Sequence, residues 1–253
     1  MPTPPYPRLR PLGDCAWIVE FGAAIDEPTR ERVMGFADAL AHAHAAWPGI
    51  VEWVPAYTSV TVHFRTDNER DLAGDSAAAL LALARGAQPL ARPGRRWRLP
   101  VCFDDAGFAP DLQALAQARA LAPQQVVEAM TSAAFRVYML GFQPGFPYMG
   151  GLPAALEMPR RATPRTAVPE RSVAVAGRMC AVYPWRSPGG WHLLGRTPLR
   201  LFDATRDDPA WLQAGDEVRW FAVDRQRFDE LERRADAGDL ARDEFLLADG
   251  AAA

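Results

Sequence analysis

The segment "SVAVAGRMCAVYPWRSPGGWHLLG", residues 172–195, contains three short apolar runs separated by glycine and proline. The runs "SVAVAG", "CAVYP" and "WHLLG" are rich in valine, leucine and aromatic residues, which is typical of strands. Further along, "LRLF" (199–202) and "EVRWFAV" (217–223) continue the pattern, with turn residues at intervals of roughly ten. This spacing predicts a β-barrel or a β-sandwich.

Residues 1–90 are expected to form a separate, small α/β domain. The stretch 26–45 predicts an amphipathic helix, because apolar residues from Val33 to Leu40 recur at positions i, i+3, i+4 and i+7. Residues 59–64 predict a strand, because apolar and polar side chains alternate there. The other elements predicted in this part are strands at 16–21 and 49–54 and a helix at 76–85.

The second domain is expected to span residues 95–253. The stretch "GAQPLARPGRR" (86–96) has the composition of a linker and separates the two parts. The remaining predicted elements are a strand at 97–103, a helical stretch at 110–131 that restarts at Pro123, a strand at 135–142 and a helix at 225–238. We therefore expect an α+β protein with a β-barrel or a β-sandwich in its second domain.

Composition excludes several classes of protein. The 253 residues are 49% apolar, which is enough for a buried core, and the net charge of −3 argues against general nucleic-acid binding. No apolar run is long enough to cross a bilayer, so no membrane association is expected. The proline-rich start lacks the apolar core of a signal peptide, and the three cysteines are widely spaced, so we expect a cytoplasmic protein. No spacing of Asp, Glu, His or Cys indicates a metal site.

All 28 basic residues are arginine. The chain therefore has no P-loop lysine and no Schiff-base lysine, which excludes those mechanisms. Residues 160–200 contain eight arginines and one acidic residue, a net charge of +7, which leaves −10 for the rest. This segment predicts either an anion site or an acidic partner surface, or else it is a set of solvated arginines that reflects codon bias.

Three segments rich in glycine and proline follow the central strands. They are "GFQPGFPYMGGLP" (141–153), "PRRATPRTAVP" (159–169) and "YPWRSPGGWHLLGRT" (183–197). So many glycines and prolines do not fit helices or central strands, so we expect ordered loops at strand ends. Rigid loops that carry arginines and aromatic residues are typical of binding sites. Arginine favours planar oxyanions such as carboxylates and phosphates.

Individual residues of these loops have more than one interpretation. Arg165, which is held between Thr163-Pro164 and Thr166, is the preferred anion binder, ahead of Arg160 and Arg161. His192 is either a general acid or base or a half-buried structural histidine. Ser187 is either a nucleophile or a turn residue, and its context favours the turn.

The predicted catalytic residues are Arg161, Arg165 and His192. The predicted substrate-binding residues are Gln143, Pro144, Gly145, Phe146, Tyr148, Arg160, Thr163, Ser187, Gly189, Gly190, Trp191 and Arg196, with Phe146 and Tyr148 as pocket walls.

Taken together, the three loops resemble the family of the bacterial 5-oxoprolinase B subunit, also called allophanate hydrolase subunit 1 or the KipI kinase-inhibitor family. The segments "WVPAYTSVTVHF" and "LPVCFDDAGFAPDL" are similar to that family as well, so the resemblance covers nearly the whole chain. It implies a small α/β domain followed by a cyclophilin-like β-barrel that carries the binding cleft.

The resemblance also implies an activity and partners. The reaction would be the ATP-dependent hydrolysis of 5-oxo-L-proline to L-glutamate, with a homologous C subunit and a lactam-opening A subunit of 5-oxoprolinase. ATP and a small anionic substrate would be the ligands, and the chain alone is expected to be inactive. The alternatives are an inhibitor of a sensor histidine kinase, a hydrolase component related to allophanate hydrolase or urea amidolyase, and a cyclophilin-like peptide binder or prolyl isomerase.

The sequence departs from the family pattern at four positions. Gln143 stands where leucine is common, and Met130 stands where histidine is frequent. Met179 and Cys180 stand where the family usually has Gln and Thr, which removes two polar groups close to the "SPGGW" loop.

Overall fold

The computed structural model describes residues 5–47, 49–66, 74–91, 94–104 and 107–247. Contacts divide the chain into two compact units, residues 1–92 and residues 93–253. The predicted domains, 1–90 and 95–253, differ from these units by two residues on each side of the boundary.

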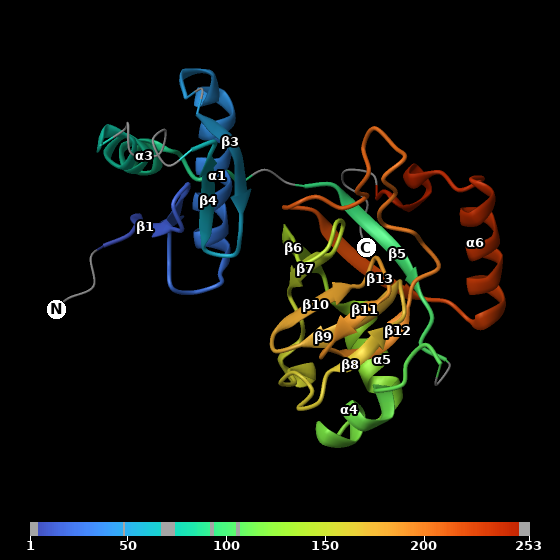
Figure 1. The fold of residues 1–253 in the computed structure, drawn as a ribbon. Coiled ribbons are helices and arrows are strands. Elements are labelled where there is room, and N and C mark those ends of the chain that lie inside the picture. Colours follow the sequence, from blue (N-terminus) through green and yellow to red (C-terminus); the bar gives the residue numbers. More distant parts are fainter. Residues whose placement is uncertain (1–4, 48, 67–73, 92–93, 105–106, 248–253) are drawn as a thin grey trace. The chain divides into compact units, whose positions relative to one another are not determined.

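Over the described residues, the first unit is a four-stranded antiparallel sheet in the order β1-β2-β4-β3 with two longer helices (Figure 1). Its elements are β1 (Arg8–Leu12), β2 (Ala16–Glu20), α1 (Glu27–Ala43), the 3-10 helix η1 (His44–Ala46), β3 (Ile50–Pro55), β4 (Ser59–Phe64) and α3 (Gly74–Gly86). The apolar face predicted for α1 is confirmed, because Val33, Phe36 and Leu40 are buried against Val60 and Val62 of β4.

The second unit is built on a sheet of seven strands in the order β12-β9-β10-β7-β6-β13-β5, counted over the described residues. These strands are β5 (Arg96–Val101), β6 (Phe135–Leu140), β7 (Pro147–Gly150), β9 (Ser172–Ala176), β10 (Met179–Val182), β12 (His192–Arg196) and β13 (Glu217–Ala222). A separate pair is formed by β8 (Arg165–Val168) and β11 (Ser187–Gly189). Of these contacts, β5 with β13 is parallel, and the other pairs are antiparallel.

The seven-stranded sheet curls until its edge strands meet. Cys102, which follows β5, exchanges two backbone hydrogen bonds with Arg196 at the end of β12, with N···O distances of 2.9 and 3.0 Å. The predicted α+β fold with a barrel in its second part is therefore confirmed.

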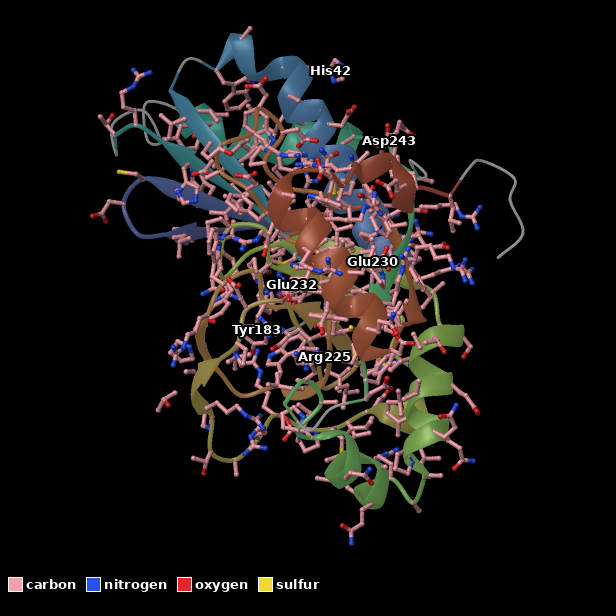
Figure 2. All side chains as sticks on the ribbon, turned by 90° about the vertical axis from the view of Figure 1, so that its right-hand side faces the viewer. His42, Tyr183, Arg225, Glu230, Glu232 and Asp243 are labelled. Carbon is pink, nitrogen blue, oxygen red and sulfur yellow. The ribbon has the colours of Figure 1, made fainter. Side chains whose placement is uncertain are left out.

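The helices of the second unit are α4 (Leu112–Ala118), α5 (Pro123–Ser132), α6 (Arg225–Ala237) and the 3-10 helices η2 (Ala154–Leu156) and η3 (Arg242–Phe245). As predicted, Pro123 begins a new helix, and α6 ends at Gly238, whose φ is 76°. Figure 2 is turned toward α6, along which Arg225, Glu230 and Glu232 lie.

Both faces of the central strands are buried. On β9, Val173 and Val175 point into the barrel core, whereas Ala174 and Ala176 belong to a second cluster on the outer face. This outer cluster also contains Phe146, together with other aromatic residues. Because alternate residues of a strand face opposite sides, the small alanines leave room for large rings outside the barrel.

The structure corrects two of the expectations from the sequence. The run "LRLF" (199–202) is not a strand: the bonds of Leu201 and Asp203 go to residues 209–211 instead, and only an isolated bridge between Phe202 and Ala210 is formed. The three loops also contain short strands, since β7, β8 and β11 lie within them. Glycine and proline are tolerated in these strands because the strands are only three or four residues long.

Cys180 lies in the barrel core and is fully buried, and burial raises the pKa of its thiol to about 12. We expect iodoacetamide at about pH 8 to label the half-buried Cys15 in the folded protein and to leave Cys180 unmodified until urea unfolds the chain, because the thiolate is the reactive form. Peptide mapping by mass spectrometry measures this. Equal labelling of Cys15 and Cys180 in the folded protein would contradict the placement of Cys180 in the core.

Candidate functional site

The loop between β6 and β7 is a tight hairpin end. Its backbone is held by hydrogen bonds from Gly141 N to Phe146 O (3.1 Å), from Gln143 N to Gly141 O (2.8 Å) and from Phe146 N to Gln143 O (3.0 Å). Phe142 and Gly145 have positive φ values of 67° and 76°. A Cβ atom at Gly145 would lie 2.5 Å from the Cβ of Phe202, so glycine is required there for both conformation and space.

The other two loops are joined to each other. In the pair β8–β11, Ser187 lies opposite Val168, and Gly189 lies opposite Arg165. The backbone N–H of Arg161 also donates to the carbonyl of Gly190 at 2.8 Å. The structure therefore brings the arginine-rich loop and the "SPGG" loop together, as the sequence suggested.

A cavity of about 220 Å³ lies where these loops meet. Phe146 is at the centre of its aromatic wall, with ring centroids 4.8 Å from Tyr148, 5.1 Å from Tyr183 and 6.1 Å from Trp191. The lining residues are Phe142, Phe146, Tyr148, Arg160, Pro164, Tyr183, Pro188, Gly189, Gly190 and Trp191. A Cβ atom on Gly189 would lie 2.3 Å from the hydroxyl of Tyr183, so this glycine keeps the wall closely packed.

Arg160 is the arginine among these lining residues. Its guanidinium carbon lies 5.9 Å from the ring centroid of Trp191, and within the described ranges it forms no ion pair. Burial raises the pKa values of the Tyr148 and Tyr183 phenols, and the nearby charge of Arg160 only partly opposes this. At neutral pH the cavity therefore presents one cation, two protonated phenols and several aromatic faces, which together suit a small planar anion.

Arg161 and Arg165, the two arginines predicted to be catalytic, bind a carboxylate of the protein itself. Arg165 makes a bidentate contact with Asp111, from Nη1 to Oδ2 and from Nη2 to Oδ1, both at 2.8 Å. Arg161 Nη1 donates to Oδ1 of Asp111 at 2.9 Å. The backbone N–H of Leu193 completes the set at 2.7 Å from Oδ2. Asp111 thus fixes both loops from one buried position just before α4.

This arrangement keeps Asp111 charged. Burial on its own would raise the pKa of the carboxyl group. The hydrogen bonds from Arg165 and Leu193, with the charges of Arg165 and Arg161, outweigh burial, and the pKa is lowered. The ionised carboxylate therefore stabilises the folded loops.

Sequence reasoning did not identify Asp111. The residue lies in "LPVCFDDAGFAPDL", a segment similar to the family, but it is distant in sequence from the arginines that it binds. An acidic residue between apolar neighbours, in a chain with a cationic segment elsewhere, was the available signal. Its partners could not be chosen from the sequence, because many acidic residues are available to pair with the arginines.

Two further candidates have structural contacts. The Nε2 atom of His192 lies 2.9 Å from the carbonyl oxygen of Pro159, a contact that suits an imidazole N–H donor and supports the structural interpretation of His192. Ser187 is buried, and its Oγ has no hydrogen-bond partner, as is also true of Oε1 of Gln143. Among the predicted site residues other than arginine, these two are the buried side-chain atoms without a hydrogen-bond partner.

Arg196 lies away from the cavity. Its Nε donates to the carbonyl of Glu170 at 3.1 Å, and its guanidinium lies 5.3 Å from the ring centroid of Phe108. Burial and the neighbouring charge of Arg171 lower the pKa of Arg196. Pro144 and Thr163 are exposed and do not line the cavity.

The residues that the structure describes hold no candidate metal site and no candidate membrane span. In those residues no group of three or more His, Cys, Asp or Glu side chains could hold a metal ion. None of the helices in the same residues is long and apolar enough to span a membrane. The departures Met130 and Cys180 are buried in the barrel core, whereas Met179 packs against the outer cluster below the cavity.

Comparisons with known proteins identify the family of the chain. The family described as carboxyltransferase domain, subdomain C and D, matches residues 7–212. A protein of Escherichia coli O157:H7, named as the B subunit of 5-oxoprolinase, is 39% identical over 209 residues, which are 83% of this chain and 93% of that protein. The protein of the same name from Bacillus subtilis (strain 168) is 34% identical over 236 residues, which are 87% of this chain and 95% of that protein.

A solved structure shows the same fold. The crystal structure of Kluyveromyces lactis urea carboxylase matches 92% of this chain and 23% of its own chain, with a TM-score of 0.75. At 22% identity, this likeness concerns the fold alone.

Replacement of Asp111 by Asn should destabilise the protein, because the change removes the negative charge that compensates two partly buried arginines. We expect the free energy of unfolding to fall by about 3 kcal/mol, at the low end for a broken buried pair because Arg161 and Arg165 are partly hydrated. Asp229→Asn removes an exposed partner of Arg225 and should cost less than about 1 kcal/mol. Urea denaturation of both variants measures the difference.

Asp111→Asn should also change how the free energy of unfolding depends on pH. Because the pKa of Asp111 is lowered in the folded state, its contribution is complete above about pH 4, the unfolded value, and is lost as the pH falls through the folded value. The stability difference between the native protein and Asp111→Asn should therefore shrink below about pH 4. A difference that is constant from neutral to acidic pH would contradict the role of Asp111 as the ionised partner of Arg161 and Arg165.

Gly145→Ala should destabilise the hairpin end more than Gly177→Ala does. Both glycines have positive φ, 76° and 56°, so both substitutions carry a backbone cost of about 1–2 kcal/mol. Only Gly145 also meets Phe202, since no atom lies within 4 Å of a Cβ at Gly177. Thermal or urea unfolding of the matched pair isolates the cost of that contact, and equal stabilities would contradict the geometry of the loop.

Proposed function

The chain belongs to the family of the carboxyltransferase domain, subdomain C and D, and on that premise we propose that it is the B subunit of an ATP-dependent 5-oxoprolinase. Such an enzyme converts 5-oxo-L-proline, ATP and water to L-glutamate, ADP and phosphate. Two relatives with this name match 83% and 87% of the chain. In this proposal the chain acts with a homologous C subunit and a lactam-opening A subunit, and it is inactive alone.

The cavity around Arg160 is the structural observation that supports this substrate. 5-Oxoproline is a nearly flat five-membered lactam that carries one carboxylate. The guanidinium of Arg160 would bind the carboxylate, and the rings of Phe146 and Trp191 would cover the faces of the lactam. A cavity of about 220 Å³ is small for a drug-sized ligand and suits a molecule of this size.

The chemistry explains why ATP is required. An unstrained lactam carbonyl is a poor electrophile, so water attacks it slowly. Transfer of the terminal phosphoryl group of ATP to the lactam oxygen releases ADP and makes the ring carbon electrophilic. Water then adds to that carbon and the C–N bond breaks, which gives γ-glutamyl phosphate. A second water hydrolyses this acyl phosphate to glutamate and phosphate.

In this scheme the residues of the cavity bind and orient the substrate and do not attack it. Arg160 would hold the carboxylate, and the aromatic wall would exclude water from the activated lactam until the complex admits it. The protonated phenols of Tyr148 and Tyr183 would be hydrogen-bond donors toward the lactam. Asp111 would act through Arg161 and Arg165, as a residue that positions the loops.

The proposal is tested with the reconstituted complex. Purified with the homologues of the A and C subunits, the chain should support phosphate release that depends on 5-oxoproline, with glutamate formed in equal amount. Phosphate release without glutamate, or no dependence on 5-oxoproline, would contradict the proposal. Inhibition of a histidine kinase by the chain, without 5-oxoproline hydrolysis, would favour the regulatory alternative instead.

Arg160→Ala should raise the KM for 5-oxoproline by about tenfold, because one charge-assisted hydrogen bond contributes about 1.5–3 kcal/mol and the exposure of Arg160 favours the lower end of that range. The matched control is Arg178→Ala, which removes another arginine of the same segment that is 83% exposed and paired with Glu157. The control should keep the KM of the native complex. If both variants have the same KM, Arg160 does not bind the substrate.

A further inference from the structure

A second hollow lies in the barrel unit, and it shares no lining residue with the Arg160 cavity. Its volume is about 670 Å³, within the range of sites for nucleotide-sized ligands. Its lining residues are Arg98, Thr131, Ser132, Arg219, Trp220, Phe221, Ala222 and Leu247. A smaller hollow of about 270 Å³ shares Arg98, Phe221 and Leu247 with it. None of these residues has a role in the function proposed above.

The outer face of the strands beside this hollow is cationic. β5 and β13 run in parallel, side by side in Figure 1, with Arg96 opposite Glu217 and Arg98 opposite Arg219. The residues that alternate with these, such as Trp97 and Trp220, belong to the barrel core, so the charged side chains share the outer face.

One carboxylate on this face is shared by several arginines. Oε1 of Glu217 lies 3.0 Å from Nε of Arg219 and 3.7 Å from Nε of Arg96. Its Oε2 lies 3.7 Å from Nη2 of Arg136, which belongs to β6. Arg98 is exposed, and no carboxylate among the described residues pairs with it. This group of four arginines and Glu217 therefore has a net charge of +3. Cations held this close together attract an anion from solution.

The other residues that line the hollow offer contacts that a simple inorganic anion would not use. Arg98 lies 5.0 Å from the ring centroid of Phe221, which leaves a flat surface of guanidinium and ring at the edge of both hollows. The hydroxyls of Thr131 and Ser132 donate to the α5 carbonyls of Val127 and Glu128 at 2.9 and 2.7 Å. Their oxygens therefore remain acceptors, which match hydroxyl or amino donors of a ligand.

We propose that this hollow binds a nucleoside polyphosphate, with its phosphates on Arg98 and Arg219 and its sugar and base toward Thr131, Ser132 and Phe221. The anionic part of such a ligand matches the unbalanced positive charge, its sugar hydroxyls match the acceptor oxygens, and its flat base matches the apolar part of the lining. No lysine is needed, because arginine binds phosphate oxygens in a bidentate manner. If the function proposed above holds, this is where the chain meets its nucleotide, although nucleotide binding by the chain alone does not require that function.

The test is equilibrium binding to the full chain, by titration calorimetry, with ATP, inorganic triphosphate and adenosine as the three probes. ATP should bind most tightly, because it alone carries both the phosphates and the nucleoside. Arg98→Gln and Arg219→Gln should each weaken ATP binding about tenfold or more, the loss expected for one charge-assisted contact. Arg98 is exposed, so its variant should keep the native unfolding midpoint.

Two control variants complete the experiment. Arg178→Gln removes the same charge from an exposed arginine that does not line the hollow, and it should leave ATP binding unchanged. Arg160→Ala should impair 5-oxoproline use by the complex while the chain still binds ATP, so failure of this inference and failure of the proposed function are distinguishable.

Three results would overturn the inference. The first is equal ATP affinity in the native chain and in Arg98→Gln. The second is inorganic triphosphate binding as tightly as ATP, which would leave only a general anion patch. The third is a loss of co-purification with the homologue of the C subunit in Arg98→Gln without any change in ATP binding, which would make the surface a protein interface.

Discussion

The buried carboxylate of Asp111 is the interaction on which the loop architecture depends. Its two oxygens accept four N–H groups, from Arg161, Arg165 and the backbone of Leu193. A charged group out of water is tolerated only when it is paired and fully hydrogen-bonded, so the loops must adopt the conformation that satisfies it. Through this single side chain, the start of α4, the arginine-rich loop and β12 are held together.

The two faces of the central strands provide the support for this arrangement. Valines point into the barrel, and the outer face carries Ala174, Ala176 and Ala181, over which Phe146 and Trp191 pack. The cavity therefore rests on a second apolar cluster. The glycines of its loops serve the same packing, since a side chain at Gly189 would meet Tyr183. A binding site supported by closely packed side chains loses little conformational entropy when a ligand binds.

The cationic segment at 160–200 illustrates how tertiary contacts change the meaning of a charge pattern. Five of its eight arginines are paired with acidic residues from outside the segment. Asp111 binds Arg161 and Arg165, Glu232 binds Arg171, Glu157 binds Arg178 and Asp236 binds Arg200. Arg160 is the member that lines the cavity. The net charge of the segment agrees with the anion site proposed there, but the sequence preference for Arg165 over Arg160 is not supported by these contacts.

Many of the helices and strands could be predicted from the sequence, because the alternation of a strand and the periodicity of a helix depend on neighbouring residues. The amphipathic face of α1, the restart at Pro123 and most of the barrel strands were predicted from such patterns. The short strands β7, β8 and β11 were missed because their glycines and prolines indicate loops, although β7 pairs with the neighbouring β6 and β8 pairs with β11. The run "LRLF" was predicted as a strand from its apolar residues, but its backbone forms only an isolated bridge between Phe202 and Ala210.

The amino-acid sequence by itself determined most of the elements, the two-part organisation, the family and the loops that form the candidate site. Only the tertiary structure decided which arginine faces a cavity, that Asp111 holds two others and that Arg98 and Arg219 gather beside a second hollow. The physical reason is that hydrogen bonds and ion pairs depend on distance in space, and only the tertiary fold brings residues 50 or more positions apart within reach of one another.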